Sequence, residues 1–187
     1  ESDFNGAADG LAQAEGELGL LQKALEQKNT AAAGADKVYK AAVVEVTKAT
    51  KGVADAQKAH ATATSSVAVL TKAIPLLKDA FDKATAAAKA TGDKELAALA
   101  TGLNGVHGKK VKALEEGKKL VVTRKAEVDK AQAVLVAKQK AATASQVALT
   151  AAQKRVADQV ATIKPAQAKV VAAKKANDAA KAQLDAV

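Results

Sequence analysis

The sequence predicts an all-α fold, a long antiparallel two-helix coiled-coil hairpin whose tip lies near Gly92. Three observations predict it: the composition, a seven-residue hydrophobic period, and a turn signal close to the midpoint. Of the 187 residues, 49% are hydrophobic but only 2% are aromatic, and alanine supplies most of the apolar count. This mixture is typical of long helices, whereas sandwiches, barrels and doubly wound sheets need larger core side chains.

The first arm is predicted over about residues 4–90. Steps of seven from Phe4 to Phe81 reach large apolar side chains, except at Ala32 and His60. Three residues after each of these positions lies a mostly small residue. This spacing marks the a and d positions of a heptad repeat.

The turn is predicted at 91–93. Gly92 suits the left-handed conformation that ends a helix, and Asp93 or Thr91 can cap the next one. The second arm, about 94–186, repeats the heptad from Ala100 to Leu184. Residues 1–187 therefore form a single elongated hairpin.

Folding the chain at this turn pairs positions that sum to 184. Large side chains then face small ones, as where Leu18 meets Ala166 and Val67 meets Gly117. The acidic N-terminal arm also meets the basic C-terminal arm. At about 1.5 Å per residue, each arm is on the order of 130 Å long.

Two features leave alternatives open. A break near 29–36, around Gly34, converts the hairpin into a three-helix bundle. Pro75 lies across the seam from the glycines of 102–108, which predicts a hinge there.

The residue types exclude several functions. The chain has no Cys, which excludes disulfides, thiolate metal sites and thiol catalysis. Lysine interrupts every apolar run, so no transmembrane helix is expected. The first residue is Glu1 rather than Met, which fits a mature exported chain, a processed product or a trimmed chain.

No group of residues points to catalysis, a cofactor or a metal. His60 and His107 both fall at a positions, roughly 25 Å apart along the paired helices, so they cannot share an ion. Together with Asn177 they are interpreted as polar seam residues that set the register. A two-helix coiled coil offers no pocket for paired carboxylates, so we expect no enzyme.

One side of the second arm indicates a partner. Leu99, Val106, Leu120 and Val134 widen its apolar face beside the seam. Scattered apolar residues add to the exposed area: Val69, Leu76, Val122 and Val136. Dimerisation into a four-helix bundle, or docking on another protein, would cover these side chains.

Two stretches carry a resemblance. Residues 74–84 with 92–96, and the Ala/Lys/Gln-rich stretch around 151–169, resemble the coiled-coil regions of bacterial exported proteins that also carry WD-repeat propellers and c-type cytochrome domains. The chain lacks a propeller and any Cys-x-x-Cys-His, so no haem role carries over. The resemblance implies an extracytoplasmic (periplasmic or cell-surface) spacer or scaffold.

The leading functional hypothesis is therefore a structural or interaction protein, with a protein partner or self-association. The net charge of +9 supports an alternative, a histone-like polyanion-binding or nucleic-acid-binding protein. The near absence of arginine and aromatic residues disfavours it. A second alternative is a lipid-surface amphipathic helix.

Overall fold

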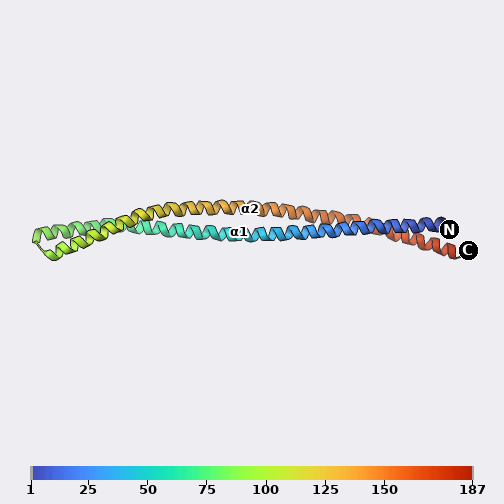
Figure 1. Ribbon diagram of the computed structural model, residues 1–187, viewed down its shortest axis with the longest axis horizontal. Coiled ribbons are helices and arrows are strands. Elements are labelled where there is room, and N and C mark those ends of the chain that lie inside the picture. The colour runs from blue at the N-terminus through green and yellow to red at the C-terminus, as the bar shows by residue number, and fades with distance from the viewer. Residues whose placement is uncertain (1, 187) are drawn as a thin grey trace. The chain divides into compact units, whose positions relative to one another are not determined.

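The chain folds into two long helices joined by a tight turn, as seen in a computed structural model that describes residues 2–186. Helix α1 (Ser2–Thr91) has 90 residues and helix α2 (Lys94–Asp185) has 92. The helices pack against each other side by side and antiparallel (Figure 1). The predicted all-α helical hairpin is confirmed.

The hairpin divides into two compact units. The tip unit is Glu45–Lys138 and contains the turn. The terminal unit combines Glu1–Val44 with Gln139–Val187, so the N-terminal part of α1 packs on the C-terminal part of α2. Each unit has its own seam, the strip along which the two helices touch.

The seam of the tip unit follows the predicted a and d positions. Nearly all of these positions are buried or half-buried, while most other positions are exposed. Its most buried side chains are Ala63, Ala84, Ala100 and Val128. A Cβ placed on Gly117 would lie 3.0 Å from Val67 Cγ2, which confirms that positions 67 and 117 face each other closely.

The seam of the terminal unit contains a buried amide. Gln159 is only 6% exposed. Its Nε2 donates to the Leu21 carbonyl oxygen at 3.0 Å, and Lys28 Nζ donates to its Oε1 at 2.5 Å. These bonds span the two helices and fit the expected pairing, because 21 and 28 lie on either side of position 25, the partner of 159.

The turn forms as predicted. Gly92 has a φ of 71°, a left-handed conformation that glycine adopts without a steric penalty. The Asp93 Oδ1 atom accepts hydrogen bonds from the amides of Glu95 at 2.7 Å and Leu96 at 3.3 Å. Asp93 is therefore the N-cap of α2, where it satisfies two amides that have no partner within the helix.

We expect Asp93→Ala to destabilise the tip unit by about 1 kcal/mol, since the two amides lose their acceptor. Thermal unfolding followed by circular dichroism measures the change. Asp55→Ala is the matched control, because this mid-helix carboxylate makes only an exposed ion pair with Lys51 at 3.4 Å. Equal losses in the two variants would contradict the capping role.

Helix α1 continues without interruption through 29–36. The three-helix alternative is therefore wrong, and the glycine at 34 is accommodated inside the helix. Pro75 and Pro165 also lie inside their helices. The glycines of 102–108 likewise remain helical. The hinge near Pro75 stays a prediction.

Candidate interaction surface

The predicted polar seam residues lie where the heptad places them, but they are not hydrogen-bonded across the seam. His60, His107 and Asn177 are half-buried. The Asn177 Oδ1 atom is buried, and no described residue donates a hydrogen bond to it. In the terminal unit, two cross-helix hydrogen bonds come instead from Gln159, which sequence reasoning did not single out.

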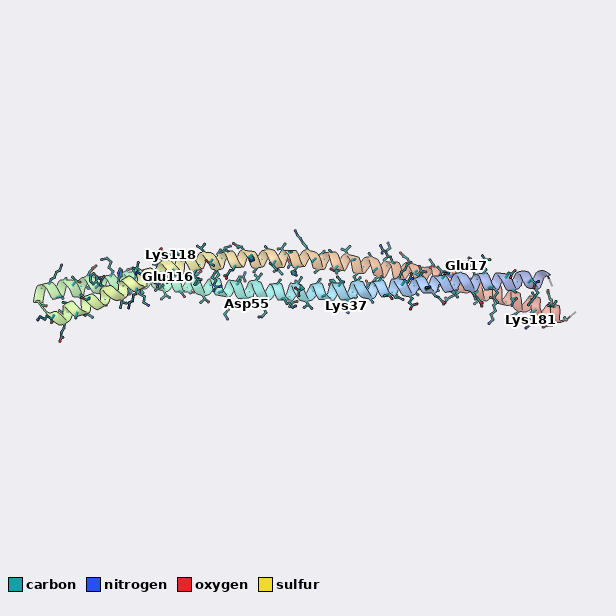
Figure 2. The ribbon with its side chains drawn as sticks, viewed as in Figure 1. Glu17, Lys37, Asp55, Glu116, Lys118 and Lys181 are labelled. Carbon is teal, nitrogen blue, oxygen red and sulfur yellow. The ribbon has the colours of Figure 1, made fainter. Side chains whose placement is uncertain are left out.

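Chemistry that needs clustered ligands finds no support in residues 2–186. Within that range, no three His, Cys, Asp or Glu side chains gather closely enough to hold a metal ion. No described helix is long and apolar enough to cross a membrane. The remaining candidate is the outer surface of the helices, where the labelled Lys37, Asp55 and Lys118 side chains extend (Figure 2).

The α2 residues predicted to contact a partner are all exposed. Leu99, Val106, Leu120 and Val134 have exposed fractions of 53%, 42%, 45% and 44%. Each occupies a g position, one residue before a seam residue, so these side chains lie along one edge of the seam. Their exposure leaves a series of apolar side chains in contact with water.

Helix α1 adds two large side chains to the same edge. Val69 and Leu76 are 66% and 70% exposed. Both occupy c positions, which neighbour the g positions of α1, and in an antiparallel pair the g positions of both helices share one side. We call these six residues the apolar flank: Val69, Leu76, Leu99, Val106, Leu120 and Val134.

The opposite edge of the tip unit has different chemistry. Its e positions are mainly polar: Gln57, Thr64, Thr71, Lys78, Asn104, Lys118, Lys125 and Gln132. The large apolar side chains exposed in the tip unit outside the flank are Val111, Val122 and Val136. The exposed large apolar side chains of the tip unit are therefore more numerous on the flank, with six, than on the opposite edge, with three.

A groove runs beside the apolar flank. It has a volume of about 740 Å³ and is open to solvent, and Val69 and Leu70 of α1 and Ala113 of α2 form its apolar part. Lys58 and Lys110 contribute its charge. A smaller groove of about 290 Å³, lined in part by Gly117 and Leu120, shares Thr62 and Ser66 with the first. Small side chains along this edge leave room for both grooves.

The groove lies in a region with few carboxylates. Neither 56–78 of α1 nor 96–114 of α2 contains Asp or Glu. The register places 70–78 against 106–114, whereas the remainder of the α1 stretch faces a part of α2 that contains Glu115, Glu116 and Glu127. Among the described residues, these lysines of the two stretches have no acidic partner within ion-pair distance: Lys58, Lys72, Lys109, Lys110 and Lys112. The surface around the groove is therefore positively charged.

One carboxylate at the far end of the tip unit is held by two lysines. Glu45 Oε1 accepts a hydrogen bond from Lys48 Nζ at 2.9 Å, and its Oε2 lies 3.4 Å from Lys138 Nζ across the seam. The hydrogen bond from Lys48, followed by that from Lys138, lowers the pKa of Glu45 below its ordinary value. This pairing stabilises the charged carboxylate.

We expect acid to weaken the tip unit through Glu45. The pKa of Glu45 is lower in the folded than in the unfolded chain. Its contribution to the stability of the fold is therefore fully present above the ordinary carboxyl pKa, and it is lost as the pH falls through the pKa that Glu45 has in the folded chain. An NMR titration of the carboxyl carbon should place its pKa below the ordinary range and show a rise in Lys138→Gln. An unchanged pKa in that variant, matching the control Lys130→Gln, would contradict the contact.

Comparisons with known proteins add no family. No protein-family model matches the chain. The search of curated proteins finds no significant match either.

Proposed function

We propose that this protein is a structural or interaction protein, a coiled-coil spacer or scaffold subunit whose hairpin docks a protein partner through the apolar flank. The observation that carries the proposal is the exposure of six large apolar side chains along one edge of the tip unit, against three along the other. Burying such side chains is worth about 1.5–3 kcal/mol each when complete. A partner that covers the flank gains the part of this energy that belongs to the still exposed surface, which favours docking there.

The compartment belongs to the same proposal. The resemblance of 74–84 and 151–169 to coiled-coil regions of exported bacterial proteins supports an extracytoplasmic assembly. The absence of Cys is compatible with export.

The test compares two matched surface variants of the full chain. Leu99→Ser with Leu120→Ser alters the apolar flank, whereas Val122→Ser with Val136→Ser alters exposed apolar residues elsewhere. We expect chemical cross-linking in the source cells to give one defined cross-linked complex that the first pair abolishes and the second preserves. Loss of the cross-linked complex in both double variants, or in neither of them, would contradict docking through the flank.

Binding to a polyanion is the second candidate function, and the unpaired lysines around the groove favour it. Phosphate contacts by lysine release counterions, so duplex DNA affinity would fall steeply with salt. We expect only weak binding to a random duplex in a salt titration, because arginines and aromatic residues are scarce. Tight, steeply salt-dependent binding would favour this candidate instead.

A further inference from the structure

We propose that the groove between Lys58 and Lys110 binds an acidic amphipathic helix of a partner protein. This deepens the proposed function and rests on it, because the groove lies beside the apolar flank. The partner helix would place apolar side chains on Val69, Leu70 and Ala113, and carboxylates near the two lysines. Each part of this chemistry follows from a separate feature of the groove.

The shape fits a helix. The α1 residues that line the groove extend from Lys58 to Leu70, about 18 Å at the rise of a helix. That length accommodates about three turns of a second helix. Small side chains at Ala61, Ser65 and Ser66 let another backbone approach closely, as helix-in-groove recognition requires.

The charge selects an acidic partner. Lys58 and Lys110 line the groove, and neither forms an ion pair with any residue of the described chain. Lys110 occupies a seam position and yet is exposed, so its ammonium group is available to a ligand. The acids on this edge are Asp55, paired with Lys51, Glu127, paired with Arg124, and Glu116. Positive charge predominates, because five lysines of the surrounding stretches have no ion-pair partner in the described chain.

The same charge disfavours a second copy of the chain. A two-fold pairing through this groove would bring the unpaired lysines of both copies toward one another, and like charges across an interface cost binding energy. A phospholipid surface or a nucleic acid would use the lysines but not the apolar part of the groove, formed by Val69, Leu70 and Ala113. An acidic helix uses both features.

The experiment measures binding of a labelled synthetic peptide to the full chain by fluorescence anisotropy. The probe is an 18-residue amphipathic helix with leucine and alanine on one face and glutamate elsewhere. The control peptide carries lysine in place of glutamate. We expect the acidic peptide to bind, the basic peptide not to bind, and salt to weaken the complex.

Substitutions show where on the chain the acidic peptide binds. The double variant Lys58→Gln with Lys110→Gln should lower the affinity for the acidic peptide about tenfold. Lys72→Gln with Lys112→Gln changes net charge equally at lysines that do not line the groove, and should change affinity less than about twofold. Val69→Ser should also weaken binding about tenfold, and Val122→Ser should not. Unchanged circular dichroism confirms folding.

Three outcomes would overturn the inference: equal binding of both peptides, equal effects of the two lysine pairs, or no effect of Val69→Ser. Sedimentation that shows a dimer abolished by Val69→Ser would assign the groove to a second copy. Tighter binding to anionic vesicles or to an oligonucleotide, lost with Lys58 and Lys110, would assign it to those ligands. If the acidic peptide does not bind, yet the cross-linked complex still depends on Leu99 and Leu120, the proposed function stands and this inference falls.

Discussion

Gly117→Leu should destabilise the tip unit by about 1–2 kcal/mol, although leucine is the better helix former. A Cβ at 117 already approaches Val67 Cγ2 to 3.0 Å, and a larger side chain must displace the stiff, β-branched valine. Overpacking costs about 1–3 kcal/mol, and the gain in helix propensity of about 0.8 kcal/mol offsets only part of it. Denaturant unfolding followed by circular dichroism measures the difference.

A reciprocal exchange makes the result specific. Val67→Ala added to Gly117→Leu reverses which helix carries the large side chain, so the double variant should recover most of the lost stability. Gly105→Leu is the control, because no atom lies within 4 Å of a Cβ at that position, and it should stabilise the helix. Stabilisation by Gly117→Leu equal to that of the control would refute the close approach of 67 and 117.

Gln159→Ala should destabilise the terminal unit by about 2 kcal/mol. The substitution removes the hydrogen bond to the Leu21 carbonyl, leaves Lys28 without its acceptor, and opens a small cavity in a buried part of the seam. A lost buried hydrogen bond costs about 1–3 kcal/mol when its partner stays unsatisfied. Thermal unfolding of the full chain, together with amide protection at Leu21 and Lys28, reports the effect.

The control for this prediction is Gln153→Ala, the same substitution at an exposed position of the same unit. It should change stability by less than about 0.5 kcal/mol. A double-mutant cycle with Lys28→Met should show a coupling of about 1 kcal/mol between Lys28 and Gln159. A coupling energy of zero, or equal losses of stability in Gln153→Ala and Gln159→Ala, would show that the Gln159 side chain does not link the two helices.

Much of the fold could be predicted from sequence because the seam obeys a simple rule. A seven-residue period identifies the inward positions, and the alternation of large and small side chains sets the register to within one turn. This rule predicts that Val67 faces Gly117, and the residue types of the turn predict a cap at Asp93 or Thr91, of which the structure has Asp93. The alanine-rich composition excluded competing folds.

The finer features depended on atomic packing. Gln159 occupies a d position, in the series of seam positions that carries mostly small residues, and the heptad pattern alone does not show which polar seam residues form hydrogen bonds. The presence of a polar residue at a buried d position was the signal that could have revealed it. The sequence showed Val69 and Leu76 as scattered apolar residues. Only the packed register places Val69 beside Ala113 in one groove.

The alanine-rich seam has a consequence for how the molecule opens. No described side chain is sealed from solvent below 2% exposure, so no single cluster anchors the pairing. Each heptad contributes a small part of the free energy that holds the helices together. Local separation of the helices therefore requires only that a few neighbouring heptads lose their contacts. The protection of amide protons from exchange should therefore vary gradually along the two helices, rather than being lost in one concerted event.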